Sequence, residues 1–407
     1  MRILLLTSFY PPEIRSISTM MQELAEGLAE RGHIVTVITP FPEDNIPDET
    51  KNHVFLEITK EKQVRVVRAK TFNGRNPHYV LRGLGELLLP FVYRRAIKKW
   101  IREPIEGVIV YIPRFSLASV GAWVRRKYGA RYLLNVQDIF PQNAIDAGII
   151  KNPALIAFYE CLERRAYSAA DALTTHTKGG RDFLIKQKGV PSDKITAVYN
   201  WIDPASWVAP NTGRFRKQYG LEGKFIFLFA GILGPTQGLE LVIETAKRLT
   251  DLPDIHFLFV GEGREKERLV RLVEMYRLNN VMFTPFVSPR EYPQLLAEID
   301  VGLMCLAPTN TTAVVPGKLF GYMAAGLPVI AFLHKESEGH RIMKEAQCGL
   351  SADSNSPERA EALIRKMYYE QTTLAKYGAN GKAYAIEHFH KEKCIHHIEQ
   401  LIIASCQ

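Results

Sequence analysis

Short apolar runs alternate along the chain with stretches whose apolar residues recur at helical spacing. Residues 3–7 and 33–39 are apolar runs typical of buried strands, and Met20, Leu24 and Leu28 between them predict a helix over 20–31. A strand, a helix and a second strand at this spacing form a right-handed βαβ unit on a parallel sheet, which indicates an α/β protein. The same pattern predicts further buried strands at 64–68, 107–111, 131–137, 172–175, 194–200, 225–230, 255–260, 301–306 and 327–332.

The stretch from 301 to 332 combines a strand, a polar loop, a helix over 318–325 and a second strand. Pro316 suits the start of the helix because its missing N–H costs nothing there, and Gly326 is typical of the end. Unpaired N–H groups at a helix start favour an anion, and Lys318 adds a full positive charge in the first turn. A solvated lysine on an ordinary βαβ unit is the alternative, but the coincidence of loop, helix start and cation favours phosphate binding.

Two further loops have the composition of phosphate-binding loops. Residues 231–238, GILGPTQG, lie between a predicted strand and a predicted helix, as loops that hold phosphates do. They lack the G-x-G-x-x-G spacing of dinucleotide-binding proteins. The strand at 255–260 is followed by Gly261-Glu262-Gly263-Arg264, where Arg264 is either a cation for a phosphate or an ordinary arginine on a helix surface.

These motifs carry a family resemblance. Pro316 to Ala331, PGKLFGYMAAGLPVIA, resembles the donor-site signature of retaining glycosyltransferases of family 4, and Leu24 to Thr39 resembles their N-terminal segment. The resemblance implies the GT-B fold, in which two Rossmann-like domains with parallel sheets hold a nucleotide sugar in the cleft between them. It implies an acceptor-side domain over 1–203, a nucleotide-sugar-binding domain over 204–380, and a helix over 381–407 that returns to the first domain.

The resemblance also implies a set of donor contacts in the second domain. Lys318 and Arg264 are expected to stabilise the leaving diphosphate. Further donor contacts are implied at Gly231, Gly234, Gln237, Gly238, Gly263, Pro285, Val315, Pro316 and Leu319.

Four charges that are common in the family are missing here. The family often has an arginine and a lysine in the glycine-bearing loop, which align with Ile232 and Gln237. Two glutamates are also common, and they align with Ala313 and Gly321. Because the second glutamate usually accepts hydrogen bonds from the donor ribose, one recognition contact is left without a candidate.

Candidate residues in the first domain lie at the carboxyl ends of strands, the edge of the sheet where α/β proteins bind ligands. Arg15 and Ser16 stand where the family usually has glycines, so they either hydrogen-bond the donor phosphate or crowd it. Asp138 follows the strand at 131–137, and the resemblance gives this position a role toward the acceptor hydroxyl, although many relatives have histidine there. The alternative is an aspartate that caps the next helix.

The basic composition bears on the partners. A net charge of +9 and a pI near 9.1 suit nucleotide diphosphates or acidic lipids, and the sequence has no nucleic-acid-binding motif. Residues 79–102 combine apolar residues with a basic cluster, so this helix either lies on an anionic membrane or packs with one solvated basic face. The resemblance favours the membrane, because related enzymes often use lipid-linked acceptors. The cluster consists of Arg94, Arg95, Lys98, Lys99 and Arg102.

Scattered cysteines and the N-terminal sequence predict a protein of the reducing cytosol. The five cysteines form no C-x-x-C pair, so neither a disulfide framework nor a zinc site is expected. The start of the chain lacks the features of a signal peptide, and no apolar run reaches the ~20 residues of a membrane span. We therefore expect a cytoplasmic protein that can lie on the inner face of the cell membrane.

The combined prediction is a retaining glycosyltransferase that moves a sugar from a nucleotide-diphosphate donor, UDP above all, to a lipid-linked or oligosaccharide acceptor in surface-polysaccharide synthesis. No metal or other cofactor is expected, because the sequence has no D-x-D motif of the metal-dependent kind. Two alternatives stay open: a nucleotide-sugar epimerase of the same fold, and a non-catalytic nucleotide-sugar-binding protein.

Overall fold

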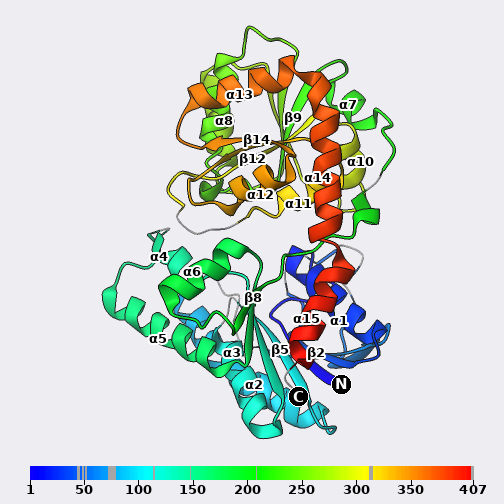
Figure 1. Ribbon diagram of the computed structural model, residues 1–407, viewed down its shortest axis with the longest axis vertical. Helices are drawn as coiled ribbons and strands as arrows, with labels where there is room; N and C mark the ends of the chain where they lie inside the picture. Colours follow the sequence, from blue (N-terminus) through cyan, green and yellow to red (C-terminus); the bar gives the residue numbers. More distant parts are fainter. Residues whose placement is uncertain are drawn as a thin grey trace. The chain divides into compact units, whose positions relative to one another are not determined.

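The computed structural model divides the chain into two compact units, Met1–Asn200 with Glu392–Gln407, and Trp201–Lys391 (Figure 1). It describes residues 1–404 apart from 44–45, 48–49, 51–52, 72–78, 113–114, 147, 208 and 311–314. The backbone alone is described for residues 79–84, 86, 87, 204 and 205.

The first unit is built on a sheet with the strand order β3-β4-β2-β1-β5-β6-β7-β8, in which only β3 runs antiparallel to its neighbour among the described strands. The strands are β1 (Arg2–Leu6), β2 (Ile34–Pro40), β3 (Ile58–Glu61), β4 (Val64–Ala69), β5 (Gly107–Ile112), β6 (Arg131–Val136), β7 (Ala172–Thr175) and β8 (Ile195–Ala197). The helices are α1 (Ser16–Glu30), α2 (Tyr79–Trp100), α3 (Phe115–Tyr128), α4 (Gln142–Asp146), α5 (Pro153–Ala169), α6 (Lys178–Lys188) and α15 (Lys391–Ile403).

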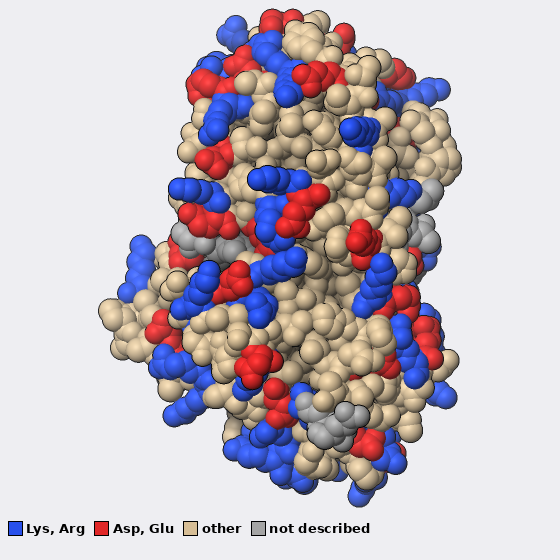
Figure 2. Space-filling view, in the orientation of Figure 1, with Lys and Arg blue, Asp and Glu red and all other residues tan. Residues whose placement is uncertain are grey.

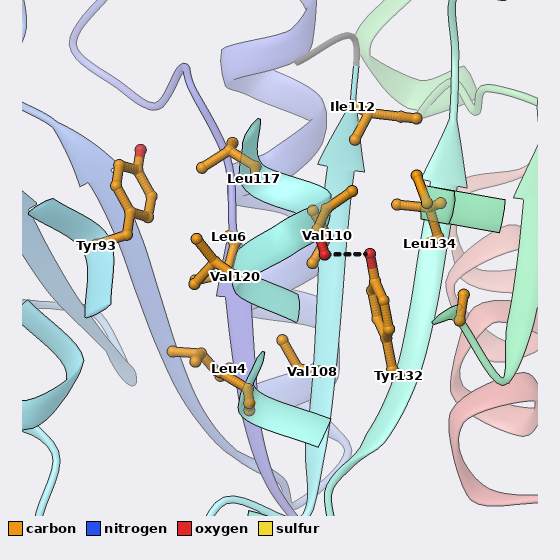
Figure 3. Close-up of a cluster of buried hydrophobic side chains, with 14 of the residues drawn as sticks. Leu4, Leu6, Tyr93, Val108, Val110, Ile112, Leu117, Val120, Tyr132 and Leu134 are labelled. Carbon is orange, nitrogen blue, oxygen red and sulfur yellow. Dashed lines mark hydrogen bonds between the residues drawn. The ribbon is translucent and has the colours of Figure 1, made fainter. Parts of the chain in front are cut away.

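Helices α2 and α3 bury an apolar cluster against this sheet. Tyr132 of β6 lies in the cluster, and its hydroxyl donates to the carbonyl oxygen of Ala118 at 3.1 Å, so the polar end of the phenol is paired inside the core (Figure 3). Strands covered in this way are apolar along their whole length, which is why the sequence predicted them as runs rather than as alternating patterns. The cluster includes Leu4, Leu6, Tyr93, Val108, Val110, Ile112, Leu117, Val120 and Leu134.

The second unit is built on a parallel sheet with the strand order β11-β10-β9-β12-β13-β14. The strands are β9 (Phe225–Ala230), β10 (Ile255–Val260), β11 (Val281–Thr284), β12 (Val301–Cys305), β13 (Val329–Leu333) and β14 (Gly349–Asp353). The α-helices are α7 (Arg214–Tyr219), α8 (Glu240–Arg248), α9 (Lys266–Met275), α10 (Tyr292–Ala297), α11 (Lys318–Ala324), α12 (Glu338–Ala346), α13 (Pro357–Tyr369) and α14 (Leu374–His388). Short 3₁₀ turns are η2 (Pro204–Trp207), η3 (Pro235–Gln237) and η4 (Gln371–Thr373).

The two parallel-sheet units confirm the predicted α/β class, but the last predicted helix is wrong. One helix was expected over 381–407, whereas α14 ends at His388 and α15 begins at Lys391. Phe389 between them is fully buried, with its ring 4.5 Å from that of Phe320. At this break the backbone pairs with Ile202, whose N–H donates to the carbonyl oxygen of Phe389 at 2.8 Å and whose carbonyl oxygen accepts from the N–H of Lys391 at 2.9 Å. The compact units divide at 391/392 rather than at the expected 380/381, and at 200/201 rather than 203/204.

Helix α15 packs against α1 in the first unit (Figure 1). A Cβ on Gly27 of α1 would lie 2.8 Å from Cδ1 of Ile395, so a bare backbone lets the helices approach. Glu399 of α15 is clamped at the same contact: Nε2 of His33 lies 2.9 Å from its Oε1, and NH1 of Arg31 lies 3.5 Å from its Oε2. Burial opposes ionisation of Glu399, but hydrogen bonds from His33 and from His396 hold its pKa below the ordinary value.

We expect Glu399→Ala to speed amide hydrogen exchange in α15 about tenfold at neutral pH, because donors left unpaired in a buried contact cost about 1–3 kcal/mol. The pKa of Glu399 is lowered on folding. Its stabilisation is therefore present above the unfolded pKa of about 4.3 and is lost as the pH falls through the folded value.

Glu392→Ala is the matched control on the same helix. Glu392 also pairs with Arg31, at 3.1 Å, but half of its side chain is exposed, so its loss should change exchange less than about threefold. Equal exchange rates in the two variants would show that Glu399 does not hold α15 in place.

Among the described residues, no helix is long and apolar enough to cross a bilayer.

Candidate active site

In the second unit, the predicted phosphate-binding elements begin at one point of the sheet. Ligands bind to parallel sheets outside the carboxyl ends of the strands, where the strand order reverses. Here β9 has β10 on one side and β12 on the other, so the order reverses between β9 and β12. The loop at 231–238 follows β9, and the segment leading to α11 follows β12. The topology therefore places both elements at the expected binding edge.

Lys318 is the first residue of α11, and its ammonium group lies beside the loop at 231–238. Its Nζ donates to Oε1 of Gln237 at 2.9 Å and lies 4.5 Å from the centroid of the Phe229 ring. A Cβ on Gly231 would lie 2.9 Å from Cε of Lys318, so the absence of a side chain at Gly231 makes room for the lysine. The amide of Gln237 and the face of Phe229 thus fix the position of the charge.

Burial lowers the pKa of Lys318 from its ordinary 10.5 to about 8, although part of the side chain keeps contact with solvent. The neighbouring thiol of Cys305 gives no compensating charge at neutral pH, because burial raises its pKa to about 12. Among the described residues, no carboxylate acts on Lys318. An anionic ligand bound beside Lys318 would therefore supply the negative charge that compensates its ammonium group.

Tyr322 holds α11 against the sheet. Its hydroxyl donates to the carbonyl oxygen of Leu228 at 3.1 Å and accepts from the N–H of Ala230 at 3.2 Å, both on β9. A Cβ on Gly302 of β12 would lie 2.6 Å from the Tyr322 ring, so this glycine makes space for the ring. This role was not predicted from the sequence, although the motif contains a tyrosine one turn after Lys318.

Trp207 occupies the space beside Gly321. A Cβ at 321 would lie 2.7 Å from Cζ3 of Trp207, and the indole also makes an edge-on contact with Tyr292, with ring centroids 5.8 Å apart. Gly321 is the position that aligns with a glutamate in related sequences. Here an indole fills the space that a side chain at 321 would need. The other aligned position, Ala313, lies outside the described residues.

The glycines after β9 and β10 let two loops touch through their backbones. A Cβ on Gly261 would lie 1.9 Å from the carbonyl oxygen of Gly231, and one on Gly263 would lie 2.2 Å from that of Leu233. The N–H of Glu265 also donates to the Leu233 oxygen at 3.0 Å. Gly263 was predicted to contact the donor, but its bare backbone is already required by this contact between loops.

The remaining glycines of the 231–238 loop differ from each other. A Cβ on Gly238 would lie 2.8 Å from Cα of Ala307, so Gly238 is required where this loop packs on the segment after β12. A Cβ on Gly234 would meet only Cγ2 of Ile232, at 3.8 Å. Gly234 is therefore the glycine of this loop whose surface is most open to a ligand.

The other residues predicted to contact the donor lie at the same edge of the sheet but differ in how exposed they are. Arg264 and Pro285 are exposed in the loops that follow β10 and β11. Pro316 is half-buried and Val315 is buried. Leu319 is fully buried and its N–H donates to the carbonyl oxygen of Pro316 at 3.0 Å, so the predicted donor contact at Leu319 does not fit the structure.

Arg15 and Ser16 lie where the strand order of the first sheet reverses, between β1 and β5. Ser16 is the first residue of α1, so the helix begins four residues earlier than the predicted start at 20. The guanidinium carbon of Arg15 lies 4.7 Å from the centroid of the Phe9 ring, which holds this side chain in the loop after β1. A phosphate contact from either residue stays a prediction.

Asp138 follows β6 with its side chain exposed, yet desolvation by the surrounding protein raises its pKa. Its charge also acts on Tyr111 of β5, whose pKa is raised first by burial and then by Asp138. Because α4 begins only at Gln142, the alternative role of Asp138 as its cap does not fit. A carboxylate with a raised pKa at the ligand-binding edge is suited to accept a proton.

A cavity of the first unit lies away from Arg15, Ser16 and Asp138. It has a volume of about 490 Å³ and is found at the opposite edge of the first sheet, where β1 and β2 begin. It contains none of the candidate residues. Its lining includes Arg2, Leu4, Thr36, Ile58, Arg65 and Ile105.

The sequence matches two protein-family descriptions, one in each unit. "Glycosyl transferase 4-like domain" matches residues 16–201, and "Glycosyl transferases group 1" matches residues 211–384. The chain is a glycosyltransferase of the family 4 type. This membership agrees with the resemblance of the segments at 24–39 and 316–331.

Similar glycosyltransferases include WcaI of Escherichia coli K12, whose name assigns it to colanic acid biosynthesis. It is 28% identical over 406 residues, which cover 97% of this chain and 98% of WcaI. WbjE of Pseudomonas aeruginosa, also named a glycosyltransferase, is 29% identical over 252 residues, which cover 59% of this chain and 60% of WbjE.

Solved structures of the same architecture confirm the GT-B fold. Sucrose-phosphate synthase of Thermosynechococcus elongatus superposes with a TM-score of 0.76 at 14% identity and 98% coverage of both chains. WaaG, a glycosyltransferase of lipopolysaccharide biosynthesis, gives 0.70 at 17% identity, covering 99% of this chain and all of WaaG. HepE of Anabaena, solved in complex with UDP, gives 0.72 at 17% identity, covering 99% of this chain and all of HepE.

Proposed function

We propose that this glycosyltransferase transfers a sugar from a UDP-sugar to a lipid-linked or oligosaccharide acceptor, with retention of the anomeric configuration, in the synthesis of a surface polysaccharide. The observation that carries the proposal is the ammonium of Lys318, fixed by Gln237 and Phe229 at the point where the second sheet reverses. A cation placed there in advance stabilises the charge that develops on a departing diphosphate.

We expect the charge of Lys318 to stabilise the diphosphate more than the dipole of α11 does. The helix has only seven residues, so its N-terminal donors are few and its dipole is short. Arg264, exposed in the loop after β10, is the second cation at this edge. We propose that the two charges stabilise the diphosphate without a metal ion, so that a chelator leaves the rate unchanged.

Asp138 is proposed to act on the acceptor. Its position past the end of β6 and its raised pKa suit a carboxylate that holds the acceptor hydroxyl and takes up its proton. The names of WcaI and WaaG, which refer to colanic acid and lipopolysaccharide, support a surface polysaccharide as the pathway, and the UDP complex of HepE supports UDP as the leaving group.

The direct test follows UDP release and the anomeric form of the product. With UDP-hexoses and a polyprenyl-diphosphate-linked sugar, we expect UDP release to require the acceptor and the new bond to keep the donor configuration by NMR. Epimerised donor or UDP formed without acceptor would support the epimerase instead. Binding of UDP without turnover on a panel of acceptors would support the non-catalytic protein.

A basic surface on the first unit supports membrane association. The described part of α2 buries one side in the core and exposes Arg95, Lys98 and Lys99 on the other, with Arg94 half-buried. The last turn of α3 adds Arg125, Arg126 and Lys127. Lysine and arginine side chains gather over α2 at the lower edge of Figure 2. Trp123 of α3 lies among them, 5.7 Å from the guanidinium carbon of Arg94 and 5.1 Å from Nζ of Lys127. We propose that this basic surface binds anionic lipid headgroups.

We expect the change of Arg94, Arg95, Lys98 and Lys99 to serine to weaken binding to vesicles with 30% anionic lipid by at least about 30-fold at 0.1 M salt, since each charge near the surface contributes about 1 kcal/mol. Sedimentation with the vesicles measures the effect. Lys217, Lys224, Lys247 and Arg248 changed to serine remove four positive charges from the second unit and serve as control. Equal binding of the basic-surface variant and the wild type would refute this surface.

A further inference from the structure

Helix α5 exposes an apolar end that the basic surface does not include. Its first turns read Pro153-Ala-Leu-Ile-Ala-Phe-Tyr159, seven residues without a charge or an amide side chain. Leu155 is 42% exposed and Phe158 is 51% exposed, and Ile149 just before the helix is 73% exposed. A helix that is apolar around its whole circumference is normally buried. We call Ile149, Leu155 and Phe158 the apolar tip.

A row of aromatic contacts connects the apolar tip to the candidate acceptor residue. The ring of Phe158 lies 5.5 Å from that of Tyr159, which lies 4.9 Å from Phe140. Phe140 also contacts Phe115 at the start of α3, with centroids 5.9 Å apart. Phe140 is two residues after Asp138 in the sequence. An apolar path therefore leads from the exposed end of α5 to the segment that carries the proposed acceptor carboxylate.

We propose that the apolar tip inserts into the acyl region of a lipid bilayer and brings the Asp138 segment to the membrane surface. This inference deepens the proposed function, on which it rests for the lipid-linked acceptor. Isolated apolar side chains are common on protein surfaces. Two large ones on the first turns of α5 and a third just before the helix, next to a candidate site, are what a membrane contact requires.

The shape and the flanks of the tip favour lipid over a protein partner. A stable protein interface buries about 800 Å² on each partner, which three side chains at the end of one helix do not supply. Lys151 before the helix and Arg164 and Arg165 in its later turns are exposed, as expected of cations that reach lipid headgroups while the apolar residues lie deeper. In Figure 2 the surface over α5, at the left edge, is mostly tan with blue and red side chains beside it.

The apolar tip and the basic surface are at opposite ends of α3. Phe115 begins the helix and belongs to the aromatic row, whereas Arg125 to Lys127 end it and belong to the basic surface. A helix of 14 residues is roughly 20 Å long. The two contacts are therefore separate, and their contributions to membrane binding can be measured independently.

The test compares Ile149→Ser/Leu155→Ser/Phe158→Ser with the wild type in vesicles of phosphatidylcholine and phosphatidylglycerol, over a series of salt concentrations. We expect the variant to lose about 30-fold or more in partition coefficient at every salt concentration, with an unchanged dependence on salt, because it removes apolar area and no charge. The basic-surface variant should instead reduce the salt dependence. The matched control, Ile34→Ser/Met275→Ser/Tyr369→Ser, removes three other exposed side chains (64%, 63% and 66% exposed) and should bind as the wild type does.

A second readout does not depend on the triple variant. The Phe158→Trp variant adds one tryptophan to the chain. We expect the fluorescence of this added tryptophan, obtained by subtracting the wild-type spectrum, to shift to shorter wavelength on vesicle binding and to be quenched by lipids with brominated acyl chains. Tyr369→Trp should show neither change. Two results with the variants would overturn this proposal: vesicle binding by the triple variant as strong as that of the wild type, or no quenching of the added tryptophan when the Phe158→Trp variant is bound to vesicles. Two results with the wild type would also overturn it: no vesicle binding at all, or a dimer that the triple variant no longer forms.

These measurements are independent of turnover. If no donor is turned over but the tip enters the bilayer, the proposed function fails and the membrane contact stands. If the triple variant transfers sugar to a water-soluble acceptor normally and also binds vesicles normally, the membrane contact alone fails.

Discussion

Lys318→Met is expected to lower kcat/KM for the sugar donor at least ~100-fold, the size of effect seen when one preorganised stabiliser of a developing charge is removed. The same variant should make the unliganded protein more stable at pH 7. Burial lowers the pKa of Lys318 to about 8, so keeping the charged form in the folded protein costs up to about 3 kcal/mol. Thermal unfolding and initial rates on one preparation measure both effects.

The sign of the pH dependence follows from the lowered pKa. Between the folded pKa of about 8 and the unfolded value of 10.5, the unfolded chain binds more protons at Lys318. The cost is therefore full below pH 8 and disappears as the pH rises toward 10.5. Folding stability should therefore rise with pH in this range while activity falls, because the charged form of Lys318 is lost above pH 8. Lys318→Arg keeps a charge and should retain more activity than Lys318→Met; equal loss in both would show that shape rather than charge is required.

Asp138→Asn is expected to lower turnover ~100- to 1000-fold while leaving the affinity for UDP within about twofold, because an amide cannot take up the acceptor proton. Desolvation raises the pKa of Asp138 above its ordinary value. The base form is therefore lost at a higher pH than for a solvated aspartate, and the rate should fall on the acidic side at a pH above about 4.

Asp138→Glu keeps the carboxylate and serves as control, with partial activity and a retained acidic limb in the pH profile. Asp146→Asn changes a half-buried aspartate of the neighbouring α4 and should leave turnover nearly unchanged. A wild-type rate in Asp138→Asn, or an acidic limb that survives in it, would contradict the assignment of this residue.

The buried strands of the fold were predictable from the sequence, whereas two of its edge strands were not. Strands β9 and β10 occupy the predicted residues because strands buried on both faces are nearly continuous apolar runs. The antiparallel strand β3, ITKE, and the outer strand β14, GLSAD, escaped prediction because edge strands carry polar residues. The break between α14 and α15 has no glycine or proline, and coincides with backbone hydrogen bonds to Ile202, which is far away in the sequence.

At the candidate site, the sequence indicated Lys318 but not what holds it. Helix start, loop and cation were visible as a local pattern. The contacts with Gln237 and Phe229 join residues more than 80 positions apart and need the strand order to bring them together. The filling of the space beside Gly321 could not be predicted either, because Trp207 lies 114 positions earlier in the sequence. Glycines expected to face the donor, such as Gly263, turned out to serve contacts between loops.

Proton uptake on UDP binding tests the central claim most directly. At pH 8 the free Lys318 is about half protonated, and an adjacent diphosphate, fully ionised at this pH, should raise its pKa and complete its protonation. Calorimetry in buffers of different ionisation enthalpy should then give about half a proton taken up per UDP bound, and Lys318→Met should bind UDP at least about 30-fold more weakly without proton uptake. UDP binding of unchanged affinity in Lys318→Met, or identical proton uptake in both proteins, would contradict the account.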